Sequence, residues 1–137
     1  MGILVDSTVF IEAERRGLSA RQALKEIALR FPGEEAAISV ITLTELAHGV
    51  MRADTEPRAA RRRLFLRELM SAVPLMPVTA AAAVRAGEID GANKSKGVHV
   101  ALADLLIGAT ALEIGYKVAT ANRRHFEAIS GLGVATF

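Results

Sequence analysis

The chain has 137 residues, a length that fits one domain, and we expect a single domain over residues 1–137. Hydrophobic residues make up 51% of it, enough for a compact core, which argues against an intrinsically disordered chain. The absence of cysteine excludes disulfides, thiolate metal sites and cysteine nucleophiles, and a net charge of +2 is too small to identify a nucleic-acid-binding protein.

Short β-like runs alternate along the chain with longer helical patterns. The first half predicts a strand at 3–5, helices to about residue 13 and from Ser19 to before Pro32, a strand at 37–41 and a helix at 42–53. The second half predicts a helix from Pro57 to about Met70, an edge strand at 75–78, a helix from Thr79 to about Lys94, a helix at 101–113, and strands at 117–121 and 134–137. Strands separated by helices pair in parallel, so we expect an α/β fold, a three-layer α/β/α domain around a central, mainly parallel twisted sheet.

Local signals support several of these boundaries. Ser19 and Gln22 have the spacing of a capping box, and Thr79 precedes an alanine-rich helix as an N-cap residue would. Pro57 fits the first turn of its helix, and Gly115 follows the end of the helix at 101–113.

No apolar run approaches the roughly 20 residues that a membrane-spanning helix needs. The first residues lack the basic start and the cleavage site of a signal peptide. We therefore expect a soluble, cytoplasmic protein that makes no contact with membranes.

Acidic residues follow two of the predicted strands, where ligands gather in parallel sheets. Asp6 comes directly after residues 3–5, and it could equally be the N-cap of the next helix. Glu45 lies just past the strand at 37–41, and a capping box with Thr42 is its alternative explanation.

Asp104 is the only charged residue between Val100 and Leu112, a strongly apolar helical segment. Aspartate is unfavourable in helix interiors, and burying an unpaired carboxylate lowers the stability of a fold by several kcal/mol. A salt bridge to an arginine is the alternative explanation. Thr120 and Asn122 fall at the end of a late strand, where they are either beside these acids or parts of an ordinary turn.

Together, three carboxylates and one amide from four separate segments predict a site of hard oxygen ligands suited to Mg²⁺ or Mn²⁺. Histidine-rich zinc spacing is absent, and His48 and His99 are isolated. Arginines cluster at 58–67 and at 123–124, where they either contact phosphates or form solvated helix faces.

At these acidic residues the chain resembles the PIN-domain family, especially the VapC-type toxins of toxin–antitoxin operons. The matching stretches are residues 4–11, 39–46, 103–111 and 120–126. They are short but occur in the family's order, and the resemblance extends over essentially the whole chain. The resemblance implies a PIN fold, with Asp6, Glu45 and Asp104 as catalytic and metal-binding residues. Asn122 and His125 occupy the fourth motif, where the family often has an acid, and Asn122 is expected to join the catalytic set.

The resemblance further implies a toxin that hydrolyses RNA with metal-activated water, using Mg²⁺ or Mn²⁺. It also implies a VapB-like antitoxin partner and a homodimer. The alternative function is a non-catalytic PIN-like module that acts with a DNA-binding partner. A phospho-acceptor receiver domain needs a lysine ending a late strand, and a haloacid-type phosphatase needs an aspartate at position 8, where this chain has Thr8.

Overall fold

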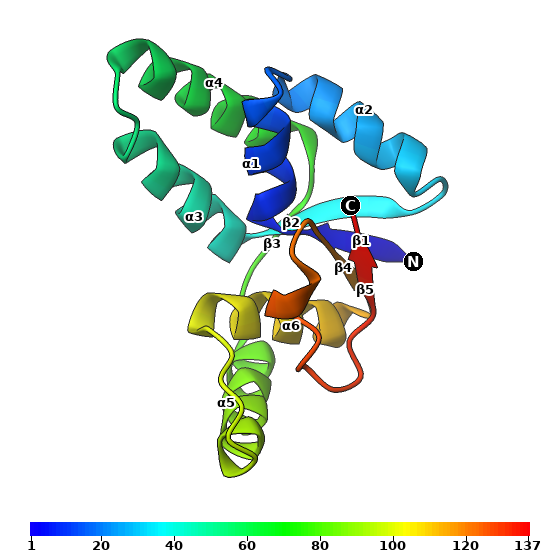
Figure 1. Ribbon diagram of the computed structural model, residues 1–137. Helices are drawn as coiled ribbons and strands as arrows, with labels where there is room; N and C mark the ends of the chain where they lie inside the picture. Colours follow the sequence, from blue (N-terminus) through cyan, green and yellow to red (C-terminus); the bar gives the residue numbers. More distant parts are fainter.

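The computed structural model describes residues 1–137, in which five parallel strands form one sheet between two groups of helices (Figure 1). The strands are β1 (Gly2–Val5), β2 (Glu35–Ser39), β3 (Leu75–Met76), β4 (Lys117–Thr120) and β5 (Val134–Thr136). The helices are α1 (Ser7–Arg15), α2 (Ala20–Arg30), α3 (Val40–Met51), α4 (Glu56–Ala72), α5 (Ala80–Ser95) and α6 (Leu102–Ile114), with a short 3₁₀ helix, η1 (Arg123–His125). The predicted α/β architecture is confirmed.

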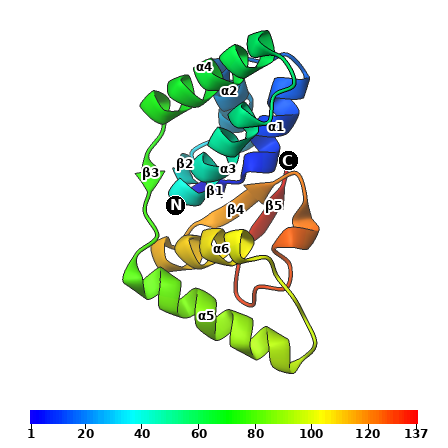
Figure 2. The ribbon, with the colours of Figure 1, turned by 90° about the vertical axis from the view of Figure 1, so that its left-hand side faces the viewer.

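The alternation of side chains along β1 divides the core into two layers. Ile3 and Val5 join a buried cluster with residues of α1 and α2, whereas Leu4 joins a second cluster with residues of α5 and α6. Figure 2 shows these helix groups on opposite sides of the sheet. Because successive side chains of a strand point to opposite faces, a fully apolar strand such as β1 is suited to the centre of three layers.

The order of the strands is β3-β2-β1-β4-β5, so β1 lies at the centre. The chain first builds outward from β1 through β2 to β3, and then crosses to β4 on the other side of β1. This reversal between β1 and β4 creates the crevice at the strand ends where α/β proteins bind ligands. The parallel register pairs Val5 with Ala119, which places Asp6 and Thr120 next to each other at this crevice.

Most predicted helix caps are present. Ser19 and Gln22 form both bonds of a capping box, the Thr79 hydroxyl accepts from the amide of Ala82, and Gly115 ends α6 with a left-handed φ of 73°. Each of these caps is formed by residues within about four positions of one another, so it depends little on the rest of the fold.

The boundary between β2 and α3 differs from the prediction. The strand ends at Ser39, and the Ser39 hydroxyl caps α3 by accepting from the amide of Ile41. Val40 and Ile41 are β-branched and were expected in the strand, but they form the first turn of the helix, where Ile41 packs against the α5–α6 core cluster. Tertiary packing outweighs β propensity here.

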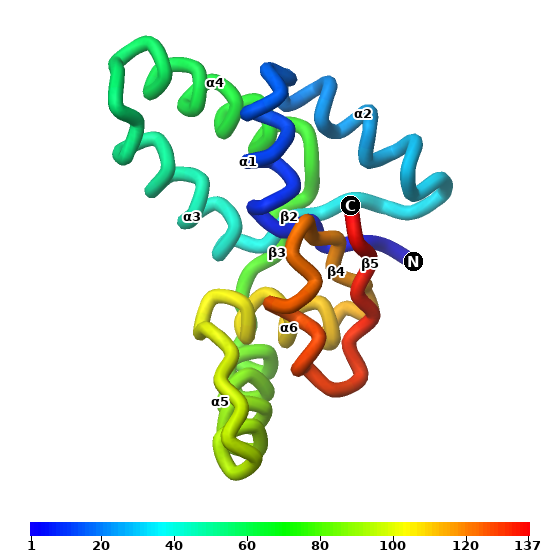
Figure 3. The backbone as a smooth tube through the Cα atoms, viewed as in Figure 1, coloured from blue at the N-terminus to red at the C-terminus, as the bar shows by residue number.

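Helices α3 and α4 pack against each other as a helical hairpin on the same side of the sheet as α1 and α2 (Figure 3). None of the helices is long and apolar enough to cross a membrane.

Candidate active site

Asp6 is held at the end of β1 by two threonine hydroxyls. Its Oδ2 accepts from Thr8 Oγ1 at 2.7 Å and from Thr120 Oγ1 at 3.0 Å, and the residue is only 2% exposed. The backbone amides of Ala121 and Asn122 in turn donate to these two hydroxyls, at 3.0 Å each. Asp6 does occupy the N-cap position of α1, but its side chain makes no capping hydrogen bond. The carboxylate is thus held by one side chain of α1, Thr8, and by one at the end of β4, Thr120, and not by the backbone amides of α1.

Glu45 is the sixth residue of α3, and the proposed capping box with Thr42 is wrong because Ser39 is the cap. Its Oε1 is buried without a hydrogen-bond partner. Burial raises the pKa of the Glu45 carboxyl, the nearby Ser7 hydroxyl opposes the shift, and the charges of Asp6 and Asp104 raise it further.

Asp104 lies in the first turn of α6, and its side chain is 13% exposed. The alternative explanation, a salt bridge to an arginine, is wrong: no arginine pairs with Asp104, and the nitrogen that faces it is His125 Nδ1, 3.8 Å from Asp104 Oδ2. Burial raises the pKa of the Asp104 carboxyl, His125 opposes this, and the charge of Asp6 adds to the rise. A salt bridge to arginine therefore does not explain this residue.

The three carboxylates line one cavity of about 410 Å³. Around them the cavity is lined by Ser7, Thr8, His99, Val100, Ala101, Ala103, Arg124, His125 and Ala128. No group of three or more aspartate, glutamate or histidine side chains already has the arrangement of a metal site. A metal site built from these carboxylates thus requires their side chains to move toward one another.

Asn122 does not line the cavity. Its side-chain Nδ2 lies 3.0 Å from His125 Nε2, and its backbone amide donates to Thr120. Ser7, His99 and His125 also line the cavity; of these the sequence pointed only to His125, as an occupant of the fourth family motif, and it assigned none of the three to the site. His125 lies within the stretch 120–126 that resembles the family, and this position was the only available signal.

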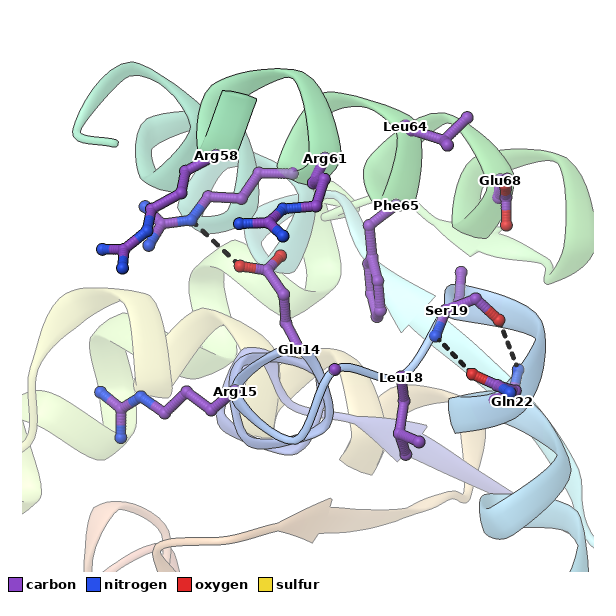
Figure 4. A pocket seen from close by; sticks show the side chains of 13 residues that line it. Glu14, Arg15, Leu18, Ser19, Gln22, Arg58, Arg61, Leu64, Phe65 and Glu68 are labelled. Atoms are coloured by element: carbon purple, nitrogen blue, oxygen red, sulfur yellow. Dashed lines mark hydrogen bonds and ion pairs between the residues drawn. The ribbon is translucent and has the colours of Figure 1, made fainter. Parts of the chain in front are cut away.

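The arginine clusters separate in space. Arg124 lines the acidic cavity, whereas Arg58, Arg61 and Arg62 line a second and larger cavity of about 700 Å³ between α4 and the α1–α2 connection (Figure 4). Arg62 Nε donates to Glu14 Oε1 at 3.0 Å there, while Leu64 is 48% exposed at its edge. We call this second cavity the α4 groove. The arginines of α4 are therefore not part of the acidic cavity.

Known proteins resemble the chain over nearly its whole length. The family model described as PIN domain matches residues 3–132. The curated protein "Ribonuclease VapC" of Rickettsia bellii is 31% identical over 137 residues, covering 99% of this chain and 96% of that protein. "Ribonuclease VapC10" of Mycobacterium tuberculosis is 36% identical over 124 residues, covering 90% of this chain and 85% of that protein.

Solved structures share the fold. The VapBC2 complex of Rickettsia felis, bound to a DNA fragment from its promoter, matches with a TM-score of 0.82 and 21% identity, covering 100% of this chain and 99% of that one. FitAcB of Neisseria gonorrhoeae matches with a TM-score of 0.75 and 26% identity, covering 96% and 95%. The family match extends over residues 3–132, and the fold and the acidic cavity are consistent with it. The chain belongs to the PIN-domain family.

Proposed function

We propose that this protein is a divalent-metal-dependent endoribonuclease and the toxin component of a VapBC-type toxin–antitoxin pair. The observation that carries the proposal is the buried Glu45 Oε1, which has no partner in a cavity that it shares with Asp6 and Asp104. The names of the relatives, ribonucleases of the VapC type, support the reaction and the substrate class.

The residues of the cavity fit a hard divalent cation. Carboxylate oxygens are the ligands that Mg²⁺ and Mn²⁺ prefer, and an unpartnered buried oxygen is the kind of atom that a cation would satisfy. The pKa values of Glu45 and Asp104 are raised by burial and by like charge, so the charges of these carboxylates disfavour one another and a cation would relieve this. We assign Asp6, Glu45 and Asp104 as the residues that hold the ion.

When bound, Mg²⁺ or Mn²⁺ supplies the positive charge that activates a water molecule and offsets the charge of the phosphodiester. Thr8 and Thr120 orient Asp6 by donating to its Oδ2, which leaves Oδ1 for the ion. Glu45 or Asp104 accepts the proton of the attacking water at a carboxylate oxygen. Arg124, which lines the cavity and forms no ion pair with a protein carboxylate, binds the phosphate of the substrate.

A VapB-like antitoxin partner is supported by solved relatives that are described as toxin–antitoxin proteins, and we propose the α4 groove as its binding surface on the chemistry of that groove. The groove combines the exposed Leu64 and the half-buried Leu18 with arginines of α4, so it suits a segment with apolar and acidic side chains (Figure 4). Leu64→Asp should abolish co-purification with the protein encoded beside this gene while leaving RNA cleavage by the free toxin intact. Loss of cleavage together with binding would contradict this placement. The homodimer implied by the family stays a prediction that sedimentation of the free chain would test.

The central test measures cleavage of a structured RNA by the antitoxin-free protein, with Mg²⁺, with Mn²⁺ and with a chelator. The wild type should cleave only with a divalent ion, and Asp104→Asn should lower the rate at least about a thousandfold, a loss of about 4 kcal/mol in transition-state stabilisation. Cleavage in the chelator, or full activity of Asp104→Asn, would overturn the proposal. Metal binding and tight antitoxin binding without any cleavage would instead favour the non-catalytic module.

A further inference from the structure

We propose that His125 is a nitrogen ligand of the metal site, so that the site holds one imidazole beside its carboxylates and selects Mn²⁺ over Mg²⁺. The inference rests on the proposed function, since it concerns the ion that Asp6, Glu45 and Asp104 would hold. It assigns a metal-binding role to a residue that the acidic motif by itself does not include.

The His125 imidazole lines the acidic cavity. Its Nδ1 faces Asp104 Oδ2 at 3.8 Å, which is too far for a hydrogen bond. Two donors that share one octahedral ion at about 2.1 Å lie roughly 3 Å apart when adjacent and roughly 4 Å apart when opposite. The observed separation falls within this range, so these two atoms can bind one ion after a small movement.

The other nitrogen of the imidazole is held by Asn122. His125 Nε2 lies 3.0 Å from Asn122 Nδ2, the Asn122 backbone amide donates to Thr120 Oγ1, and Thr120 Oγ1 donates to Asp6. A continuous chain of polar contacts therefore runs from Asp6 to His125 around the cavity. Histidine ligands of metals characteristically donate the N–H of their second nitrogen to such a partner, so Asn122 has to present its Oδ1 to Nε2 when an ion is bound.

Asn122 also determines which nitrogen of His125 carries the proton. With its Nδ2 donating to Nε2, the neutral imidazole carries its proton on Nδ1, which faces Asp104. If the amide turns by half a rotation, Asn122 Oδ1 accepts from a protonated Nε2, and the Nδ1 lone pair becomes free for an ion. In this change the Nδ1 proton passes to water and a proton from water adds at Nε2, so the charge of the imidazole stays the same. Asn122 thus acts as the positioning residue of His125.

The donor set then determines the preferred ion. Mg²⁺ binds oxygen ligands almost exclusively, whereas Mn²⁺ also accepts imidazole nitrogen. Among the first-row divalent ions that bind sites with nitrogen ligands, Mn²⁺ binds more weakly than Co²⁺ and Ni²⁺. Replacing one oxygen ligand by nitrogen therefore weakens the site for Mg²⁺ more than for Mn²⁺.

The decisive measurement is pulsed electron paramagnetic resonance of Mn²⁺ bound to the untagged protein without RNA. The chain has only three histidines, His48, His99 and His125, so coupling of Mn²⁺ to an imidazole ¹⁴N can be assigned by substitution. The coupling should be present in the wild type, vanish in His125→Gln, and persist in His48→Gln and His99→Gln. Coupling that survives His125→Gln, or that is lost only in His99→Gln, would overturn the inference.

Calorimetric titration adds a second readout that a structural role would not reproduce. His125→Gln should lower the affinity for Mn²⁺ about tenfold and change the affinity for Mg²⁺ by less than about threefold. His125→Asp should raise the affinity for Mg²⁺ about tenfold, because it adds a charged oxygen ligand. An equal loss for both ions in His125→Gln would overturn the inference.

The two proposals fail in different ways. If the wild type binds neither Mn²⁺ nor Mg²⁺, the metal site of the proposed function is wrong, and the role of His125 is wrong with it. If Mn²⁺ binds and RNA is cleaved but no ¹⁴N coupling appears, only the role of His125 is wrong.

Discussion

The two sides of the acidic cavity treat their carboxylates differently. On the sheet side (Asp6, Thr8 and Thr120), the carboxylate is almost completely buried, yet two hydroxyls satisfy one of its oxygens. On the helix side (Glu45 and Asp104), both carboxyls are more accessible, yet the pKa of each is raised and Glu45 Oε1 has no partner. Burial penalises the charge of every one of these carboxylates, and hydrogen bonds to the charged form offset that penalty for Asp6, whereas Glu45 Oε1 accepts none.

The physical reason lies in how each side is anchored. The sheet side is fixed by backbone hydrogen bonds between β1 and β4, including the Asp6 amide to the Ala119 carbonyl at 2.9 Å. The helix side approaches the cavity from α3 and α6, which are joined to the sheet mainly by side-chain packing. We therefore expect the sheet side to stay in place and the helix side to move when an ion binds.

The largest expected effect is stabilisation of the fold by the ion. Mn²⁺ at a hundredfold excess over its dissociation constant should raise the free energy of unfolding by about 2.7 kcal/mol, because only the folded chain presents the site. Thermal unfolding with increasing Mn²⁺ measures the effect, and Ca²⁺-free buffer with chelator gives the baseline. An unfolding temperature that does not depend on Mn²⁺ would show that the helix side is not completed by a cation.

The next effect is a loss of stability on the sheet side. Asp6→Asn should lower the free energy of unfolding in chelator by about 2 kcal/mol, because Thr8 and Thr120 then donate to a neutral oxygen in place of a charged one. Urea denaturation measures it. If the substitution left stability unchanged, the two threonine hydrogen bonds would not be what makes burial of Asp6 tolerable.

A smaller loss of stability is expected when Thr120, the buried donor to Asp6, is replaced. Thr120→Val should cost about 1 kcal/mol, because Asp6 loses one donor and the Asn122 amide loses its acceptor. Thr110→Val is the matched control, since Thr110 is equally buried but its hydroxyl bonds only to the Leu106 carbonyl in its own helix. Equal losses for the two variants would show that contact with Asp6 adds nothing.

The smallest effect has the opposite sign and depends on pH. The pKa of Asp104 is raised in the folded state, so its ionised form opposes folding at neutral pH and its protonated form does not. Asp104→Asn should therefore raise the free energy of unfolding of the metal-free protein at pH 7 by less than about 1 kcal/mol. The gain is small because solvent screens the charge of this partly accessible carboxylate. The gain should vanish as the pH falls below about 4, the value for an unfolded aspartate. Destabilisation by Asp104→Asn at pH 7 would contradict the distinction between the two sides.

Local chemistry explains which elements could be predicted. The caps at Ser19 and Thr79 and the stop at Gly115 depend on a few neighbouring residues, and all three are where the sequence placed them. The start of α3 was misplaced because Val40 and Ile41 have β propensity, and only their packing and the Ser39 cap make them helical. The edge strand was predicted to reach residue 78 but ends at Met76, before Pro77, which cannot donate a backbone hydrogen bond.

From the sequence alone Asp104 is unusual, because an aspartate inside an apolar helix conflicts with its immediate surroundings, whereas Asp6 and Glu45 are notable only because each follows a predicted strand. The sequence could not determine what contacts each of them. Thr120 reaches Asp6 only because β4 crosses over to lie beside β1, whereas His125, in η1 after β4, reaches Asp104 from a position nearby in the sequence. Contacts between residues more than a hundred positions apart depend on strand order, and strand order is set by how the whole chain packs.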